Sequence, residues 1–187
     1  MGRKRLVKSP LHTGLLIILI ALAVYFVTLF LMRSFETPYQ TVLRETQVWA
    51  DVPQQFIQEE NLMVGEKSLA LVFYKTGPDT IACAILEKGP LFNRMMGGIT
   101  LLTFTPEDMQ ETPDSIKTVH NFNDWVNNKV CIEGWLLWGV TKDDVKQIWV
   151  NGEEACLRRG EGYDFTLFYF VNSEPMDGIG PKMEFLW

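Results

Sequence analysis

Hydrophobic residues are distributed so unevenly along the sequence that the chain divides into two parts. From Gly14 to Met32, nineteen consecutive positions carry no charged residue and no proline. A helix rises about 1.5 Å per residue, so a helix of this length crosses the roughly 30 Å hydrocarbon core of a bilayer. The large residues from Leu29 to Arg33 do not form the small-x-small pattern that signal peptidases cleave. We therefore expect an uncleaved transmembrane helix, with a cleavable signal sequence as the alternative.

Residues 33–66 are predicted to be a connector that contains short helices. Proline disfavours helical backbone in the residue before it, so Phe35–Pro38 should end the first helix. The apolar spacing in Tyr39–Trp49 predicts a short amphipathic helix. Asp51–Pro53 is typical of a helix start, with Asp as the cap and Pro in the first turn. A further helix is therefore predicted from Gln54 to Leu62.

From Lys67 onward the hydrophobic pattern changes to the period of two that is typical of strands. Leu69, Leu71 and Phe73 should point to one face and their neighbours to the other, yet both sets are apolar. Such strands are central strands that are covered on both sides. Further strands are expected at Ile81–Leu86, Ile99–Phe104, Lys129–Val140, Val145–Val150, Glu153–Arg159, Asp164–Val171 and Lys182–Trp187.

The turns between these segments favour antiparallel pairing. Asn151-Gly152 is the strongest hairpin signal, because both residues accept the positive φ of a type I′ turn. Short strands with a turn about every ten residues indicate an antiparallel sandwich. Residues 67–187 are therefore predicted to form a mainly β domain, either an antiparallel β-sandwich or a curled sheet.

Charge is distributed as unevenly as hydrophobicity. Five of the 17 basic residues flank the apolar run, and none of the 23 acidic residues precedes Glu36. Residues 34–187 therefore carry 12 basic and 23 acidic side chains, a net charge of −11. Basic residues are enriched on the cytoplasmic side of membrane spans. We expect residues 1–13 to be a cytoplasmic tail and residues 67–187 to be extracytoplasmic, in a single-pass protein of the cell membrane. The acidic outer part argues against nucleic-acid binding.

Three cysteines, Cys83, Cys131 and Cys156, leave two interpretations open. One pair could form a disulfide in an oxidising compartment and leave a third thiol free. Cys83 and Cys131 lie within apolar segments that resemble strands, so small buried thiols explain them equally well. There is no CxxC motif, so neither redox chemistry nor a zinc site is favoured.

The most polar part of the chain, residues 105–128, is predicted to be a long surface excursion with one helical turn at Pro106–Met109. Long loops often carry function. His120, Asp124 and Trp125 in this segment are candidate binding residues, and so are Arg158 and Arg159 near the C-terminus. One imidazole does not make a metal site, and no known catalytic motif is present. We therefore predict no catalytic residue, no metal site and no cofactor.

Aromatic residues are concentrated in the last third of the sequence. At strand spacing they are expected to form the core of a small sandwich, although a binding face is the alternative. The set is Trp135, Trp138, Trp149, Phe165, Phe168, Tyr169 and Phe170.

In Gly139–Ala155, a turn leads into a Val-rich strand and then into Asn-Gly. This segment resembles a stretch found in uncharacterised membrane-anchored surface proteins of Bacillus-like bacteria. Leu69–Tyr74 and Ala82–Lys88 resemble segments of the same proteins. The resemblance covers about a third of the chain. It implies a membrane-anchored surface protein and no particular activity.

These patterns favour a non-enzymatic binding or accessory module. It would be held in the bilayer through Gly14 to Met32 and would contact another membrane or envelope protein. A small-ligand receptor or hydrolase on the outer face is an alternative, and a membrane-embedded signalling regulator is another.

Overall fold

The computed structural model describes residues 10–47, 52–96, 99–104, 115–121, 134–142, 144–159, 165–174, 176 and 180–187. The chain divides into two compact units, Met1–Glu36 and Thr37–Trp187. Within these described residues, the first unit contains the long helix, and the second contains a short helix and twelve strands.

Helix α1, Pro10–Ser34, is apolar around its whole described circumference. Two of its polar side chains bond to the backbone of the same helix. The Thr28 hydroxyl donates to the Val24 carbonyl at 2.9 Å, and the Ser34 hydroxyl donates to the Phe30 carbonyl at 2.9 Å. Residues Thr13–Ser34 are long and apolar enough to cross a membrane, and none of the span is buried within the protein. The predicted apolar helix is therefore confirmed.

Helix α2, Pro38–Thr46, confirms the predicted short helix. Thr37 caps it, because its hydroxyl accepts from the Gln40 N–H at 3.2 Å while the Gln40 side chain accepts from the Thr37 N–H at 2.9 Å. This reciprocal pair is a capping box, and Pro38 follows at the first helical position.

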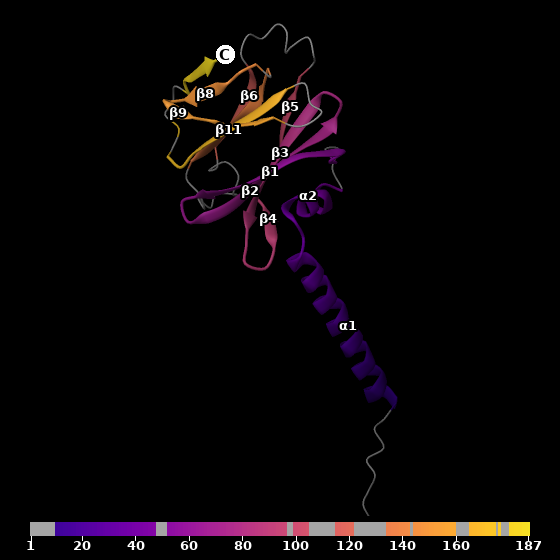
Figure 1. Cartoon of the computed structure of the whole chain (residues 1–187). Coiled ribbons are helices and arrows are strands. Elements are labelled where there is room, and N and C mark those ends of the chain that lie inside the picture. The colour runs from indigo at the N-terminus through magenta and orange to yellow at the C-terminus, as the bar shows by residue number, and fades with distance from the viewer. Residues whose placement is uncertain are drawn as a thin grey trace, which may run out of the picture. The chain divides into compact units, whose positions relative to one another are not determined.

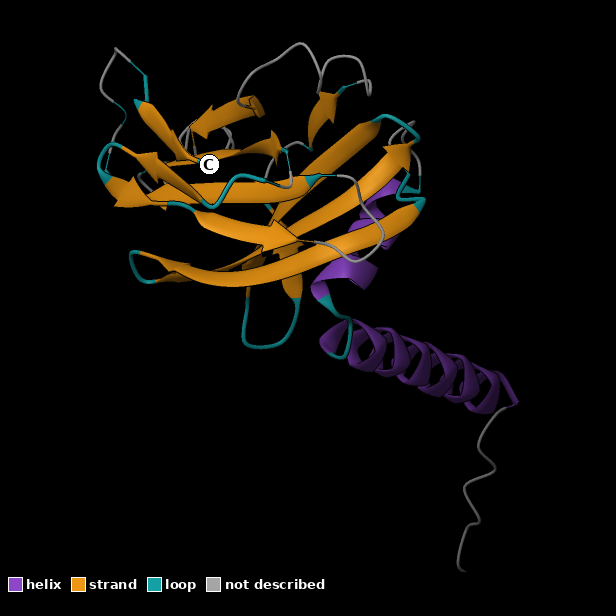
Figure 2. Ribbon diagram, turned by 45° about the horizontal axis from the view of Figure 1, so that its top comes forward, coloured by secondary structure: helices purple, strands orange, loops and turns teal. Residues whose placement is uncertain are grey.

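All paired strands are antiparallel, and they form three sheets (Figures 1 and 2). Sheet A contains β1 (Gln55–Val64), β2 (Lys67–Gly77), β3 (Thr80–Lys88), β4 (Asn93–Met95) and β5 (Thr100–Thr103). Sheet B has the order β10 (Cys156–Arg159), β11 (Thr166–Asn172), β7 (Trp135–Thr141) and β6 (Ser115–Asn121). Sheet C has the order β12 (Met183–Leu186), β8 (Gln147–Val150) and β9 (Glu153–Glu154).

Three apolar clusters hold these layers together. Leu71 and Phe73 of sheet A pack with Leu136 and Trp138 of sheet B in the central cluster. The opposite face of sheet B packs against sheet C, and the opposite face of sheet A packs against α2. In order, the layers are therefore α2, sheet A, sheet B and sheet C, which makes the predicted sandwich a layered one that is not closed into a barrel.

The face of sheet A beneath α2 carries small residues. Ala70, Ala82 and Ala84 are fully buried there, beside Val42 of the helix. Their methyl groups allow the helix backbone to approach the sheet closely. The two-sided burial that was predicted for the central strands is confirmed.

The predicted helix from Gln54 to Leu62 is wrong, because these residues belong to β1. β1 pairs with β2 from Gln55 to Val64, with a register shift between Phe56 and Gln58. The strand β2 is buried on both faces and needs hydrogen-bond partners along its whole length. This hairpin pairing overrides the local preference of a Glu- and Gln-rich segment for helix. The β domain therefore begins before residue 67.

The predicted irregular excursion over residues 105–128 is also wrong in part. Ser115–Asn121 is the strand β6, which pairs with β7 along its full length. The proposed helical turn at Pro106–Met109 lies outside the described residues, as do residues 122–133. The predicted strand from Lys129 is described only from Gly134 onward, and β7 begins at Trp135.

Glycine has a specific backbone role at two positions next to strands. Asn151 and Gly152 have φ of 53° and 87°, which confirms the predicted type I′ hairpin between β8 and β9. Gly134, immediately before β7, has φ of 126°. A Cβ atom at this position would lie 2.2 Å from the Asn172 carbonyl oxygen, so only glycine fits there.

We expect Gly134→Ala to lower the free energy of unfolding of the β domain by about 2–4 kcal/mol, because it adds a steric clash to an unfavourable φ. Urea unfolding of the full-length protein in detergent, followed by tryptophan fluorescence, measures this change.

Gly65→Ala is the matched control. Gly65 also has a positive φ, 58°, but a Cβ atom there would meet nothing within 4 Å. This substitution should lower the free energy of unfolding by only about 1 kcal/mol. Equal losses in the two variants would contradict the role assigned to the Asn172 contact.

Candidate functional site

Among the described residues, a polar cluster joins the two main sheets where their edges meet. β1 is an edge strand of sheet A and β10 is an edge strand of sheet B. Glu60 on β1, Arg158 on β10 and Tyr169 on β11 converge at this edge. We call these three residues, together with Gln58, the edge cluster.

Glu60 is the centre of the edge cluster, and its side chain is only 12 % exposed. The Arg158 guanidinium forms two bonds to its carboxylate, one from Nε to Oε1 and one from Nη2 to Oε2 at 3.1 Å. The Tyr169 hydroxyl donates to Oε2 at 2.9 Å, and the Gln58 amide donates to Oε1 at 2.9 Å. The Arg158 guanidinium carbon also lies 6.0 Å from the centre of the Tyr169 ring. Both carboxylate oxygens are therefore fully used.

The edge cluster holds fixed charges. Burial raises the pKa of Glu60, but hydrogen bonds from Arg158, Tyr169 and Gln58 outweigh it and leave the pKa below its ordinary value. Hydrogen bonding to Glu60 raises the pKa of Arg158. Burial, and after it hydrogen bonds with Cys156 and Glu60, raises the pKa of Tyr169. All three pKa values move away from neutrality, so this arrangement suits a clamp between sheets better than proton transfer.

The two arginines that the sequence marked as binding residues both bond within the domain. Arg158 belongs to the edge cluster, and Arg159 donates from Nη2 to the Val145 carbonyl at 3.2 Å. His120 lies on β6, paired in register with Leu136. Asp124 and Trp125 lie outside the described residues. The structure therefore joins Arg158 to partners that the sequence did not indicate, and a binding role for the five residues stays a prediction.

Glu60 and Tyr169 were missed by sequence reasoning for a physical reason. Glu60 is 98 residues from Arg158 in the chain, and Glu59-Glu60 reads as one acidic pair among many. Tyr169 was assigned to the core, which is correct for its ring but not for its hydroxyl. No local signal could reveal the pairing.

A second candidate site is the outer face of sheet C. Six of the seven aromatic residues assigned to the core are buried, but Trp149 is 37 % exposed. Its cross-strand partners are Glu154 on β9 and Glu184 on β12. Two residues further along β12, Leu186 is 51 % exposed on the same side of the sheet. We call Trp149, Glu154, Glu184 and Leu186 the Trp149 face.

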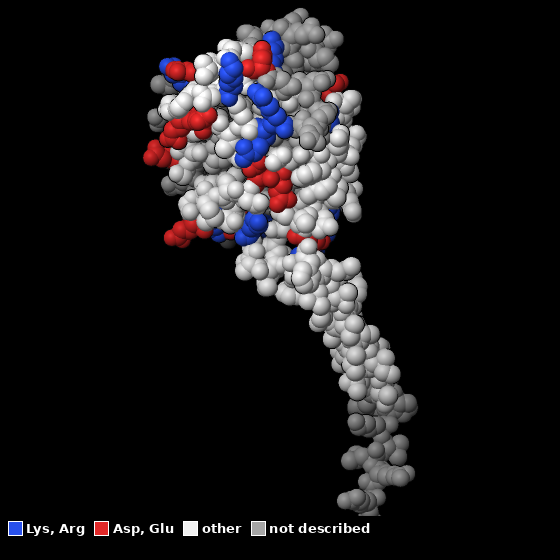
Figure 3. Space-filling view, in the orientation of Figure 1, with Lys and Arg blue, Asp and Glu red and all other residues white. Residues whose placement is uncertain are grey.

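Acidic side chains surround the apolar part of the Trp149 face. Glu153 and Glu154 are exposed on β9, and Glu184 pairs with the exposed Lys182 at 2.7 Å. In the space-filling view, acidic atoms gather over β8 and β9 on the left side of the domain (Figure 3). The face therefore combines an exposed indole with a mainly acidic rim.

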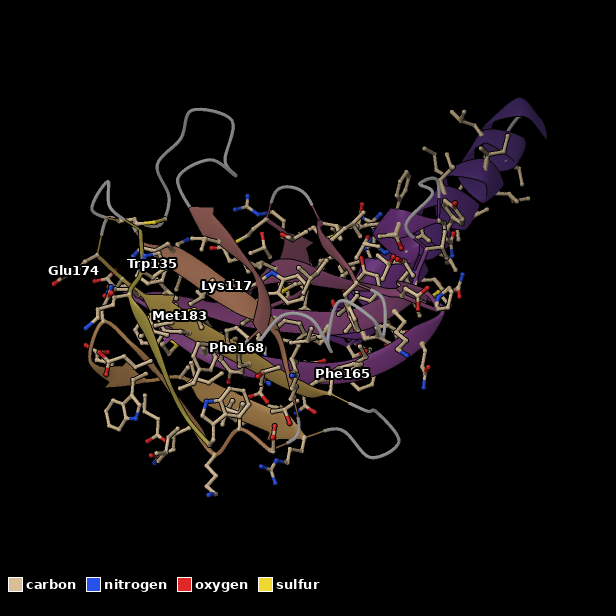
Figure 4. The ribbon with its side chains drawn as sticks, turned by 90° about the horizontal axis from the view of Figure 1, so that it is seen from above. Lys117, Trp135, Phe165, Phe168, Glu174 and Met183 are labelled. Atoms are coloured by element: carbon tan, nitrogen blue, oxygen red, sulfur yellow. The ribbon has the colours of Figure 1, made fainter. Side chains whose placement is uncertain are left out.

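The inner side of sheet C is fixed to sheet B, so the Trp149 face has a firm support. Trp135 and Phe168 of sheet B pack in the same cluster as Met183 of β12 (Figure 4). Lys117 of β6 reaches across to the Met183 sulfur, with Nζ to Sδ at 3.0 Å. Ile148 and Val150 are fully buried on this inner side of β8, whereas Trp149 between them points outward.

The described cysteines are both free thiols. Cys83 is buried in β3, and burial raises its pKa well above the ordinary value. Cys156 is exposed at the start of β10. Cys131 lies outside the described residues. Within the described ranges there is no group of three or more His, Cys, Asp or Glu side chains that could hold a metal ion.

The chain thus belongs to a structural class in which an apolar helix, long enough to cross a membrane, is followed by a layered antiparallel β domain. No family model, no curated protein and no solved structure matches it.

Glu60→Gln should lower the free energy of unfolding at pH 7 by about 1–2 kcal/mol, because a neutral amide weakens the bonds to a half-exposed Arg158. The pKa of Glu60 is lower in the folded than in the unfolded protein. Its stabilisation is therefore complete above the unfolded pKa, near 4.5, and is lost as pH falls through the folded pKa. Urea unfolding at a series of pH values between 3 and 7 measures the difference.

Glu154→Gln provides the control, since Glu154 is an exposed strand residue of the same type. We expect it to change stability by less than about 0.5 kcal/mol at every pH. A Glu60→Gln effect that persists unchanged below the folded pKa would show that the carboxylate charge is not the cause.

Proposed function

We propose that this protein is a single-pass, membrane-anchored extracytoplasmic module that binds another membrane or envelope protein through the Trp149 face. The exposed tryptophan on the supported outer surface of sheet C is the observation that carries the proposal. In this proposal the protein is non-enzymatic, and the edge cluster holds its two main sheets together.

The properties of α1 support a membrane anchor. Its described side chains are apolar on all sides and remain exposed, which in water would be unfavourable over 22 residues. The Thr28 and Ser34 hydroxyls bond to helix carbonyls, so these two groups present no unpaired donor to lipid. The basic residues before α1, Arg3, Lys4 and Arg5 among them, support a cytoplasmic N-terminus.

The chemistry of the Trp149 face favours a protein partner. Tryptophan is among the residues most enriched in the energetic centres of protein interfaces, because its large ring buries much area at little entropic cost. The glutamates on either side disfavour an anionic lipid surface. They instead suit a partner that has an apolar pocket for the indole and basic side chains around that pocket.

The proposed orientation predicts the reactivity of Cys156. In a Cys131→Ser background, a membrane-impermeant maleimide should label intact cells at Cys156, because this thiol is exposed in the outer domain. Cys83 should react only after denaturation, because it is buried. Mass spectrometry of the labelled full-length chain locates the adduct and also shows whether α1 is retained.

Cys156→Ser should abolish the label on intact cells. Labelling that requires cell lysis would reverse the proposed orientation. A mature chain that lacks α1 would replace the anchor with a cleaved signal sequence.

Binding through the Trp149 face predicts a position-specific crosslink. A photoreactive phenylalanine analogue at Leu186 should give one discrete adduct with a membrane or envelope protein in intact membranes. Adding Trp149→Ala should reduce the yield of that adduct at least about tenfold, because interface tryptophans commonly contribute 2 kcal/mol or more. Thermal unfolding of the Trp149→Ala protein should change little, because the side chain points outward.

The matched control places the same analogue at Leu101, which is 42 % exposed on β5 of sheet A. This position should give no such adduct. Equal adducts from both positions, or an adduct from Leu186 that Trp149→Ala leaves unchanged, would disprove binding through the Trp149 face.

A further inference from the structure

The turn between β3 and β4 carries an exposed apolar tip. Leu91 and Phe92 are 51 % and 50 % exposed, next to the exposed Pro90. About half of each of these two large apolar side chains therefore remains uncovered by the domain. Such a tip indicates contact with something outside the domain.

The attachment of the domain to α1 restricts what this contact can be. α1 ends at Ser34 and the cap of α2 is Thr37, so only Phe35 and Glu36 lie between them. The three Cα–Cα steps from Ser34 to Thr37 span at most about 11 Å when fully extended. If α1 crosses the bilayer, the first turn of α2 must therefore lie close to the headgroups.

The β3–β4 hairpin lies beside that first turn. Tyr39 of α2 and Met95 of β4 both pack on the same cluster of sheet A. In both ribbon views the hairpin projects from the side of the domain on which α2 begins (Figures 1 and 2). The apolar tip therefore lies on the same side of the domain as the point at which the chain enters it from α1.

The charges beside the tip suit a lipid surface. Lys88 and Arg94 stand on either side of the turn, and both are exposed. Glu87 accepts from both Lys67 and Arg94, so this end of sheet A carries more basic than acidic charge among these residues. It differs in this respect from the Trp149 face. Basic side chains around an apolar tip are typical of segments that enter the headgroup region.

The backbone of the turn also suits a site of low polarity. The Gly89 N–H donates to the Phe92 carbonyl at 3.2 Å, and Pro90 has no N–H. A Cβ atom on Gly89 would lie 2.7 Å from the Phe92 carbonyl oxygen, so glycine is needed for this close turn. Gly89 and Pro90 therefore present no free N–H group when the tip enters lipid.

We propose that the tip formed by Pro90, Leu91 and Phe92 inserts into the outer leaflet of the bilayer and gives the domain a second contact with the membrane. This inference rests on the proposed membrane anchor. With two contacts, the domain no longer rotates freely about the connection at residues 35–36, and its outer sheets keep a fixed orientation to the membrane plane.

Depth-dependent quenching tests the insertion. The full-length protein, with Cys131→Ser and Cys156→Ser, is placed in nanodiscs of phosphatidylcholine and phosphatidylglycerol. One cysteine at a time is introduced and labelled with an environment-sensitive fluorophore: Leu91→Cys at the tip, Leu22→Cys in α1, or Leu186→Cys on sheet C. The buried Cys83 is retained. Lipids with a spin label on the acyl chain then quench only those fluorophores that reach the hydrocarbon region.

The expected result is quenching at positions 22 and 91 but not at position 186, although Leu91 and Leu186 are equally exposed in the domain. Adding Phe92→Asn should reduce the ratio of inserted to free tip about fivefold, because it removes a half-exposed aromatic ring from the lipid contact. Circular dichroism of each variant checks that the domain remains folded.

The alternative outcomes separate the two proposals. Quenching at position 22 without quenching at position 91 would overturn the insertion and leave the anchor intact. A lack of quenching at position 22 would overturn the anchor itself. Equal quenching at positions 91 and 186 would mean that the whole domain lies on lipid, which contradicts a specific inserted tip.

Discussion

The burial of β2 and β3 on both faces is the constraint on which the rest of the domain depends. A strand with apolar side chains on both faces cannot leave either face in water, so each face must be covered by another layer. α2 covers one face over a patch of alanines, and sheet B covers the other with larger side chains. Sheet B is itself apolar on both faces, and sheet C covers it in turn. No further layer is needed beyond sheet C, because the outer side of that sheet carries charged side chains.

Much of this architecture was readable from the sequence, because the patterns involved are local. The alternation at Leu69–Phe73, the Asn151-Gly152 turn and the apolar run of α1 each depend on residues close together in the chain. β1 was not readable, because its Glu- and Gln-rich sequence is a strand only through its pairing with β2. β6 was hidden for a similar reason, since its polar sequence resembles a loop until it pairs with β7.

The candidate sites were less accessible than the fold. Arg158 is a candidate binding residue by sequence, but Glu60 occupies its guanidinium from the other sheet. Trp149 was grouped with the aromatic core because its spacing fits a strand, and only the register of β8 reveals that it points outward. In both cases the deciding fact is which strands lie side by side. Once that is known, the edge cluster is a clamp and the Trp149 face is the more suitable surface for a partner.

The strand order of sheet B has a consequence for how the protein folds during synthesis. β7 lies between β6 and β11, and β11 is followed by β10, which precedes it in the chain. Sheet A, by contrast, begins as a meander of neighbouring strands and can form as soon as it is made. β7, with both faces apolar, has an open edge until β11 has been synthesised. During that interval the nascent chain exposes an apolar strand with an unpaired edge, which is prone to aggregate. Production of the folded protein should therefore depend on protection of the nascent chain, even if the finished domain is stable.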